Sequence, residues 1–497
     1  MELSPIPPCI LVIFGGTGDL THRKILPALY NLAHQKLLPS RFAVVAVGRR
    51  EKTLAEYANE AGVSIEKHAR FPMDATLYRD FRQTLFYHTV HFDQDNGYSD
   101  LSRLLATLDQ DLNIGGNRLF YLAVGPEFFE PIVANLRRHG FLAPHDKAWQ
   151  RLIIEKPFGN SLLSARRLNQ TITEAFAEQS IFRIDHYLGK EMVQSIIDIR
   201  FANELFEPLW NHHYIDNIQI SACETLGVEN RSAYYDKVGA LGDMIQNHLL
   251  QILALIAMEP PVLVEPESIR DEKVKLLRSL ARFNSTMIPP NPVFGQYGPG
   301  LIGGKHVVGY RQENKVAADS TTDTYAALRI QINNPRWANV PFYLRSGKRL
   351  ARKTTAIVVQ FKPAVVFPQP KQPLAPNLLT IRIQPREELL LQFNTKQPGI
   401  QGEIIPVQMS FCQKCRNCET YANSPEAYEK LLFDALRGDS TLFTRWDEVE
   451  KSWEIVEAIG EHRERSQPLF PNYAAGAWGP AAADQLLAGD ERQWWNR

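Results

Sequence analysis

Residues 10–20 read ILVIFGGTGDL, an apolar run that leads directly into a glycine-rich turn. The apolar part is too short for a membrane span or a signal-peptide core, and it is typical of a buried strand. The turn opens a helical pattern, so its amide groups and the helix N-terminus can cradle a pyrophosphate. Its spacing departs from G-x-G-x-x-G, so a simple tight turn is the alternative. The candidate cofactor ligands are Gly15, Gly16, Thr17, Gly18, Asp19 and Leu20.

The pattern around this stretch alternates short apolar runs with amphipathic segments. A helix is indicated through residues 25–30, and further strands at residues 42–47, 119–123 and 152–155. Alternation of this kind predicts βαβ units and a parallel sheet. We therefore expect a Rossmann-type, doubly wound α/β domain over residues 1–185, with its ligand at the carboxyl ends of the strands.

The pattern changes beyond about residue 190. Alternating polar and apolar residues at 217–222, 325–330 and 356–361 predict a mostly antiparallel sheet. Helices are expected near 239–258, whose apolar part we interpret as a buried core helix, and near 425–436. Proline-rich stretches at 289–299 and 363–376 are expected to be long loops. The second part, residues 186–497, is thus predicted to be a larger α+β domain covered by helices.

Composition excludes some classes of partner. The 497 residues carry 55 Lys plus Arg and 55 Asp plus Glu, so no global field favours nucleic acid or an anionic membrane. Five cysteines are few for this length, which suits a reducing cytoplasm. Cys412, Cys415 and Cys418 are spaced for one metal ion, but no partner cluster completes a site. A polar loop with free thiols is favoured, and no metal site is expected.

Basic residues follow two of the predicted strands. Arg49 comes first off the second strand, where a guanidinium can pair with a 2′-phosphate, so NADP is favoured over NAD. Glu51 nearby and the surface habit of arginine leave the alternative open. Lys156 stands at the end of another strand, where it can touch both nicotinamide and substrate, although a strand-capping surface lysine has the same pattern.

Residues 183–190 read RIDHYLGK and place several functional groups around one glycine turn. Asp185 can hold and charge-stabilise an imidazole. His186, Tyr187 and Lys190 can donate hydrogen bonds to a dianionic phosphate. The alternative is a solvated polar turn, so the segment needs support from the rest of the chain.

Seven motifs occur in an order that closely resembles glucose-6-phosphate dehydrogenase over nearly the whole length. They are GGTGDL (15–20), NRLFYLA (117–123), EKPFG (155–159), RIDHYLGKE (183–191), QNHLLQ (246–251), VPFYLRSGK (340–348) and YAAGAWGP (473–480). The resemblance implies oxidation of D-glucose 6-phosphate at C1 to 6-phospho-D-glucono-1,5-lactone with reduction of NADP. This reaction is the first step of the oxidative pentose phosphate pathway.

The resemblance also implies a role for individual residues. His248 is the general base and Asp185 orients it, whereas from the residues alone a buried core histidine is the alternative. The implied substrate-binding set is Lys156, His186, Tyr187, Lys190, Glu224, Asp243 and Lys348, with Lys353 as a weaker member. Because Asp243 precedes His248 by about one and a half α-helical turns, the two are not expected to share a helix face.

Some members of the family hold a second, structural NADP on basic residues of the second domain. Arg352, Lys353, Arg382 and Gln384 lie in a suitable region, but Thr354 stands where a basic residue is expected, which argues against such a site. The family usually pairs through its large sheet, so a homodimer or homotetramer is implied.

Two other functions remain possible from the sequence. An enzyme of the glucose-fructose oxidoreductase type shares the architecture but needs no phosphate-binding segment. A non-catalytic NADP-binding sensor retains the fold without the chemistry. The joint presence of Asp185, Lys190 and His248 argues against the sensor.

Overall fold

The computed structural model describes residues 5–142, 148–281, 292–363, 374–399, 402–412 and 423–495. They form two compact units. Unit 1 is Met1–Gly189 with Val264–Arg270 and Asn423–Glu450, and unit 2 is the remainder. The chain thus leaves unit 1 after Gly189 and later returns to it twice, whereas the sequence had suggested two consecutive domains that meet between residues 185 and 186.

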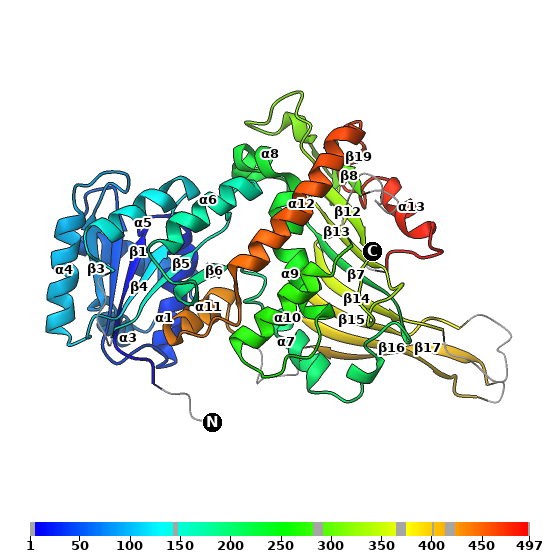
Figure 1. Ribbon diagram of the computed structural model, residues 1–497, viewed down its shortest axis with the longest axis horizontal. Coiled ribbons are helices and arrows are strands. Elements are labelled where there is room, and N and C mark those ends of the chain that lie inside the picture. Colours follow the sequence, from blue (N-terminus) through cyan, green and yellow to red (C-terminus); the bar gives the residue numbers. More distant parts are fainter. Residues whose placement is uncertain are drawn as a thin grey trace. The chain divides into compact units, whose positions relative to one another are not determined.

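Unit 1 is built on a seven-stranded sheet whose order is β18-β6-β5-β4-β1-β2-β3 (Figure 1). Its strands are β1 (Cys9–Phe14), β2 (Phe42–Gly48), β3 (Leu85–Thr89), β4 (Arg118–Leu122), β5 (Gln150–Ile154), β6 (Ile181–Ile184) and β18 (Phe443–Thr444). All pairs are parallel except β18 with β6. The predicted parallel sheet is confirmed, and its chain order reverses between β4 and β1, where such folds bind ligands.

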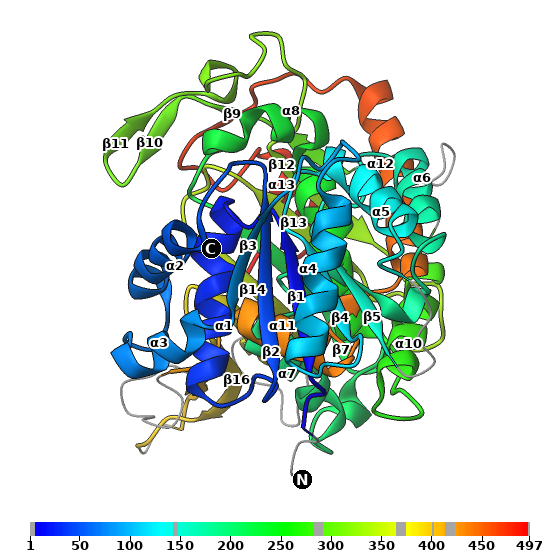
Figure 2. The ribbon, with the colours of Figure 1, turned by 90° about the vertical axis from the view of Figure 1, so that its left-hand side faces the viewer.

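Helices lie on both sides of this sheet, as Figure 2 shows with α1 to α3 on one side and α4 to α6 on the other. They are α1 (Leu26–His34), α2 (Leu54–His68), α3 (Ala75–Arg82), α4 (Tyr98–Asp111), α5 (Phe129–Arg138) and α6 (Leu162–Thr173), with short 3-10 turns η2 (Pro126–Phe128) and η3 (Glu178–Ser180). Buried apolar side chains of β1 and β2 pack against those of α1 and α2 and form the core between sheet and helices. The domain is doubly wound, as predicted.

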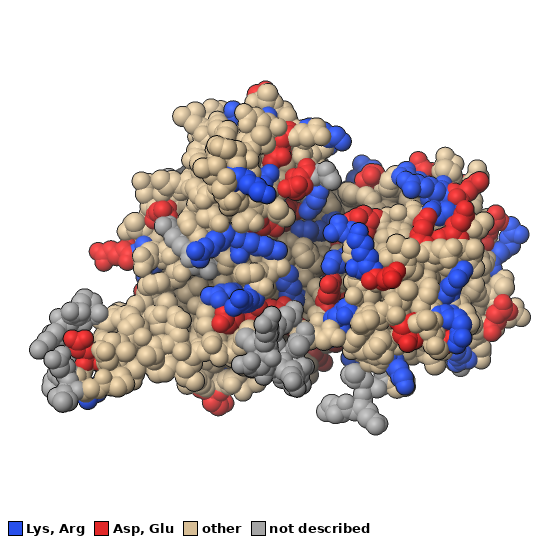
Figure 3. Space-filling view, turned by 180° about the vertical axis from the view of Figure 1, so that it is seen from behind, with Lys and Arg blue, Asp and Glu red and all other residues tan. Residues whose placement is uncertain are grey.

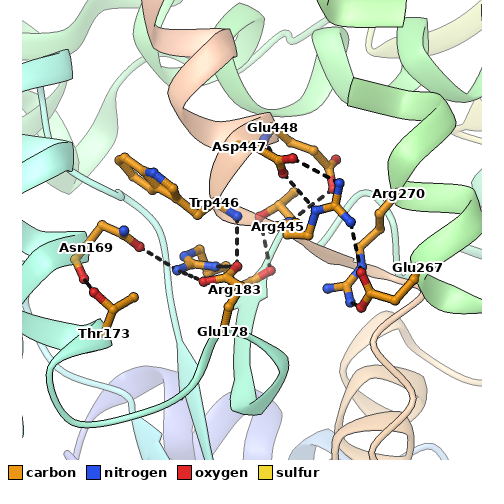
Figure 4. Close-up of polar contacts among 11 residues, drawn as sticks. Asn169, Thr173, Glu178, Arg183, Glu267, Arg270, Arg445, Trp446, Asp447 and Glu448 are labelled. Atoms are coloured by element: carbon orange, nitrogen blue, oxygen red, sulfur yellow. Dashed lines mark hydrogen bonds and ion pairs between the residues drawn. The ribbon is translucent and has the colours of Figure 1, made fainter. Parts of the chain in front are cut away.

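The segment Asn423–Glu450 is held in unit 1 by helix packing and by ion pairs. Helix α11 (Ala427–Arg437) packs on α1, and buried Glu429 receives Arg70 at 2.6 Å. The carboxylate of Glu178 makes a second connection. It accepts hydrogen bonds from the Arg183 guanidinium, at 2.5 and 2.9 Å, and from the backbone N–H of Trp446 at 2.9 Å (Figure 4). These contacts explain why residues far along the sequence belong to the first unit.

Unit 2 contains an eight-stranded sheet with the order β17-β16-β15-β14-β7-β13-β12-β8. Its strands are β7 (Ile215–Cys223), β8 (Val293–Gly295), β12 (Tyr325–Ile330), β13 (Phe342–Gly347), β14 (Thr354–Phe361), β15 (Leu378–Gln384), β16 (Glu388–Lys396) and β17 (Ile404–Cys412). Every pair is antiparallel except β13 with β7, which confirms the mostly antiparallel prediction. Small strands are β9 (Tyr297–Gly298), β10 (Gly300–Ile302), β11 (Lys305–Val307) and β19 (Tyr473–Ala474).

The remaining helices belong to unit 2 or run across the division of the chain. They are α7 (Glu191–Phe201), α8 (Ser232–Ala240), η6 (Leu241–Leu249), α9 (Leu250–Ala257), α10 (Pro266–Arg278), α12 (Trp446–Ser466) and α13 (Ala482–Ala488), with 3-10 turns η4 (Glu207–Leu209), η5 (Glu229–Arg231) and η7 (Tyr310–Gln312). The run 232–257 is long and apolar enough to cross a membrane, but 94% of its most apolar window is buried. It is therefore the core helix that the sequence predicts, and η6 packs on β7, β12 and β13.

Two local predictions need correction or lie outside the described residues. The stretch 289–299 is not one long loop, because β8 and β9 pair there with β12 and β19. Cys412 is disulfide-bonded, so the free-thiol prediction is wrong for it, while Cys415 and Cys418 lie outside the described residues. Most of the predicted loop 363–376 also lies outside them.

Candidate active site

The glycine turn after β1 is shaped by its closeness to the neighbouring strands. Gly15 has φ +91°, and a Cβ there would lie 2.2 Å from the carbonyl oxygen of Ala123. A Cβ on Gly16 would lie 2.7 Å from that of Ala46. The N–H groups of both glycines donate to the Val47 carbonyl at 2.9 Å. Only glycine fits at these two positions, because the turn packs directly on the backbone of the strands on either side of β1.

The helix after this turn begins with a π-helical segment, η1 (Thr21–Ile25), before α1. The Thr21 hydroxyl and the Gly18 N–H both donate to the Gly15 carbonyl at 2.9 Å, which closes the turn. Asp19 is exposed and pairs with Arg23 at 3.5 Å. The helix N-terminus is thus held directly behind the glycine turn, an arrangement that favours an anionic group.

Arg49 lies at the carboxyl edge of the sheet. It follows β2, and its guanidinium lies over the ring of Phe128, 5.3 Å from the centroid. Phe128 follows β4, so this contact passes across the edge at which β1 ends. The position is the reversal point of the strand order, where a bound dinucleotide is expected.

Lys156 follows β5 beside a buried carboxyl group that the sequence analysis did not single out. One oxygen of Glu155 accepts hydrogen bonds from the hydroxyls of Tyr121 at 2.7 Å and Tyr428 at 3.1 Å. Burial raises the pKa of Glu155, against the hydrogen bonds of the two tyrosines and the charge of Lys156. The charge of Asp185 acts on Glu155 as well, so strands β5 and β6 bring three ionisable groups to one edge.

The turn after β6 begins with buried Asp185. Its Oδ1 accepts the N–H of Tyr187 at 2.9 Å, and its carbonyl accepts the N–H of Leu188 at 3.0 Å. The rings of His186 and Tyr187 lie 5.1 Å apart, and His186 is half-buried. The segment is an ordered turn, and Lys190 stands at the start of α7.

In unit 2 the predicted sugar residues Glu224 and Lys348 form an ion pair. They follow the parallel neighbours β7 and β13, whose carboxyl ends coincide. The Lys348 ammonium lies 5.1 Å from the ring centroid of Tyr235, a buried residue that the sequence analysis missed. Burial, and then the charge of Asp243, raises the pKa of Tyr235. The doublet Tyr234-Tyr235 before the motif at 246–251 was the available sequence signal.

Asp243 and His248 lie in η6, which is π-helical rather than α-helical. In a π-helix residue i+5 bonds to residue i, so His248 stacks one turn above Asp243. The expectation that the two do not share a face is therefore wrong, because it assumed 3.6 residues per turn. Asp243 is 3% exposed and His248 is fully buried, and Arg231 pairs with Asp243 at 3.6 Å.

The basic residues considered for a second cofactor make few contacts among the described residues. Arg352 and Lys353 are exposed, and none of the ion pairs among described residues includes either of them. Arg382 pairs with Glu388 of the adjacent strand. Lys353 is therefore exposed, whereas Lys348 is half-buried in its ion pair with Glu224.

Two family models match the chain. "Glucose-6-phosphate dehydrogenase, NAD binding domain" matches residues 12–195, and "Glucose-6-phosphate dehydrogenase, C-terminal domain" matches residues 197–495. The matches together extend over nearly the whole sequence, and their border lies near the change of pattern seen at about residue 190.

Curated relatives and solved structures agree with these matches. Glucose-6-phosphate 1-dehydrogenase of Bacillus subtilis is 45% identical over 498 residues, 100% of each chain, and that of Chlamydia pneumoniae is 46% identical over 98% of this chain and 96% of the relative. A structure titled "Glucose-6-phosphate dehydrogenase in complex with its substrate glucose-6-phosphate" has a TM-score of 0.89 at 33% identity, covering 99% of this chain and 100% of the other. The Mycobacterium avium enzyme has a TM-score of 0.80 at 33% identity, with 99% of both chains covered.

Proposed function

This chain belongs to the glucose-6-phosphate dehydrogenase family, and we propose that it oxidises D-glucose 6-phosphate at C1 to 6-phospho-D-glucono-1,5-lactone while NADP is reduced to NADPH. The observation that carries the residue assignment is the π-helical pairing of Asp243 with His248. A buried carboxylate and a buried imidazole lie one turn apart on one helix face, which supports roles for both side chains in the same site.

The residues that follow β1 and β2 fit NADP. The glycine turn packs closely on Ala123 and leads into the start of η1, and a helix N-terminus behind such a turn suits the approach of a diphosphate. Arg49 supplies a guanidinium for the 2′-phosphate, and Lys156 follows the end of β5. When bound, NADP supplies the hydride acceptor. The proposed cofactor residues are Gly15, Gly16, Thr17, Gly18, Asp19, Leu20, Arg49 and Lys156.

His248 is the proposed general base. It takes the proton of the C1 hydroxyl as hydride leaves C1, so that the C1–O bond becomes the lactone carbonyl. Asp185 orients the imidazole and stabilises it once it is protonated. The full burial of His248 supports this role, because a side chain packed on all sides is held in a defined orientation.

The remaining residues hold the sugar and its phosphate. His186, Tyr187 and Lys190 donate to the phosphate, and their turn is followed directly by the N-terminus of α7, which favours an anion. Glu224 and Asp243 accept from sugar hydroxyls, while Lys348, Lys156 and the weaker candidate Lys353 complete the substrate set. The ion pair of Lys348 with Glu224 supports a joint role for these two residues.

We also propose that residues 186–497 carry the surface through which two copies pair, as a homodimer or a homotetramer. The strands β16 and β17 end the large sheet, and Ile404, Met409 and Phe411 of β17 are 47%, 62% and 50% exposed. In Figure 3 few charged side chains cover this end of unit 2. An apolar strand surface of this kind is expected to be covered by a partner. The proposed location is the cytoplasm.

Initial rates separate this function from the glucose-fructose oxidoreductase type. The wild-type protein is assayed with glucose 6-phosphate and with glucose, each in the presence of NADP and then NAD. We expect turnover with the phosphorylated sugar and a strong preference for it, because charge-assisted hydrogen bonds to phosphate add about 1.5–3 kcal/mol each. The variant Lys190→Gln is expected to raise the KM of glucose 6-phosphate and to leave that of NADP unchanged. Equal rates on the two sugars would contradict the phosphate-binding role.

A further inference from the structure

The helix that carries Asp243 and His248 starts at a kink. Gly239 has φ +61° and ψ −174°, a backbone conformation that interrupts the run between α8 and η6. Of the N–H groups at the start of η6, that of Leu241 also donates to the Val238 carbonyl in the preceding turn, so local bonding is reduced but not lost. These N–H groups find acceptors on one distant residue: the Ala240 N–H donates to the carbonyl of Asp323 at 2.9 Å, and the Leu241 N–H donates to its Oδ2 at 3.0 Å.

Asp323 and its two neighbours in the chain each make further contacts that fix their positions. It is fully buried, and its Oδ1 pairs with Arg463 of α12. The next residue, Thr324, donates its N–H to the Gly295 carbonyl at 2.7 Å. The preceding one, Thr322, donates its hydroxyl to the Asp236 carbonyl at 2.6 Å. A Cβ on Gly239 would lie 2.6 Å from Oδ1 of Asp323, so the kink and the carboxylate are closely packed.

We propose that Asp323 is a positioning residue that fixes the π-helical turn of η6 and thereby sets the sugar-binding geometry of Asp243. The proposal rests on the proposed function of that helix. Asp243 is two residues beyond the capped Leu241, within the first turn. Because π-helical turns are rare and appear mostly as single-turn bulges in α-helices, the unusual hydrogen-bond register needs support from outside the helix.

Loss of the cap has a definite geometric consequence. If the first turn relaxes to α-helical bonding, residues five apart separate by about 140° around the axis, since each residue turns about 100°. Asp243 then leaves the face that it shares with His248. The residue nearest the cap moves most, so we expect sugar binding to suffer more than the proton transfer at the far end of the helix.

The test is steady-state kinetics of Asp323→Ala at a temperature where the variant is folded. We expect the KM of glucose 6-phosphate to rise about tenfold, which corresponds to about 1.4 kcal/mol of lost binding free energy. The kcat is expected to stay within about threefold and the KM of NADP to be unchanged. Asp323→Asn, which keeps an acceptor for Leu241, is expected to recover part of the loss.

Asp216→Ala is the matched control, since Asp216 is also an arginine-paired carboxylate of unit 2, bound to Arg492 at 2.8 Å. It contacts neither α8 nor η6 in any hydrogen bond of the described residues. We expect a loss of melting temperature without a change in the KM of glucose 6-phosphate. A rise in that KM as large as the one in Asp323→Ala would mean that general destabilisation explains both.

A double-mutant cycle with Asp243→Ala tests the route of the effect. If Asp323 acts by placing Asp243, its removal has little further effect on KM once Asp243 is absent. Additive changes would overturn the proposal. Should Asp323→Ala not fold, Arg463→Gln replaces it, because that change removes the partner that holds the carboxylate in place against Leu241. The KM of glucose 6-phosphate is then expected to rise, and an unchanged KM would overturn the proposal.

Two different results would contradict the proposed function and the positioning role of Asp323. A wild-type protein that does not prefer glucose 6-phosphate contradicts the function itself. An active wild type, together with an Asp323→Ala variant that behaves like Asp216→Ala, contradicts only the positioning role of Asp323.

Discussion

The two π-helical segments, η1 in unit 1 and η6 in unit 2, are built in opposite ways. Each begins shortly after a glycine with positive φ, Gly15 at +91° and Gly239 at +61°. The turn before η1 is closed by its own residues, since Gly18 and Thr21 both donate to Gly15. The start of η6 has one local bond, from Leu241 to Val238, and is otherwise closed by Asp323, which is 82 positions away in the chain.

This difference separates binding from chemistry in the proposed mechanism. A locally closed turn such as the one before η1 presents backbone groups to a ligand and needs little else from the fold. A turn capped from a distance can present side chains, here Asp243 and His248, in a geometry that local sequence preferences do not produce. Each of the following variants tests one side of this contrast.

The largest effect is expected for His248→Asn in η6. A positioned general base contributes about 10² to 10⁴ in rate, so kcat is expected to fall by that factor. Binding of glucose 6-phosphate, measured by calorimetry, should remain, because the amide keeps a similar shape and Asp243 stays in place. Exposed His213→Asn is the control in the same unit and is expected to leave kcat unchanged. Near wild-type turnover of His248→Asn would mean that η6 does not carry the base.

A smaller effect is expected for Arg49→Ala, which tests the binding side. Loss of a charge-assisted pair with the 2′-phosphate costs about 1.5–3 kcal/mol, so the KM of NADP is expected to rise about 10- to 100-fold. The KM of NAD, which lacks this phosphate, should change little. Arg50→Ala is the matched control. The Tyr87 hydroxyl donates to the backbone carbonyl of Arg50, so this contact remains when the Arg50 side chain is removed. A similar loss for both cofactors in Arg49→Ala would contradict the assigned role.

The same contrast explains what could be predicted from the sequence. The strand over residues 9–14 and its glycine turn were predictable because the pattern and the constraint lie in one short stretch. The position of Arg49 followed from the order of strand and loop, which the structure bears out at the edge of β2. The identity of the ligands then came from the resemblance to a family rather than from spacing.

Features that depend on distant residues were not predictable in this way. The apolar pattern of 241–249 indicates a helix but does not distinguish i→i+4 from i→i+5 bonding, because Asp323 decides the first turn. Nothing in the sequence around Asp323 marks it as a cap. For the same reason the return of residues 423–450 to unit 1 was missed, since their partners Arg70 and Glu178 become visible only in the folded chain.

The smallest effect concerns the support behind η1, where α11 packs on both η1 and α1. Burial raises the pKa of Asp434 in α11 to about 6 from a usual 3.8, although Lys430 pairs with it at 2.6 Å. The folded state therefore holds the proton more tightly than the unfolded state. This contribution to stability is complete below about pH 3.8 and is lost as the pH rises through about 6.

The variant Asp434→Asn lacks this titration, so its stability relative to the wild type is expected to increase as the pH rises from 4 to 7, by about 1–3 kcal/mol. Urea unfolding of both proteins at each pH measures the difference, in which the other ionisable groups cancel. A difference that stays constant with pH would mean that Lys430 fully compensates the buried carboxylate. A difference that follows the expected sign would show that the packing behind η1 tolerates a buried charge, whereas the cap of η6 depends on one.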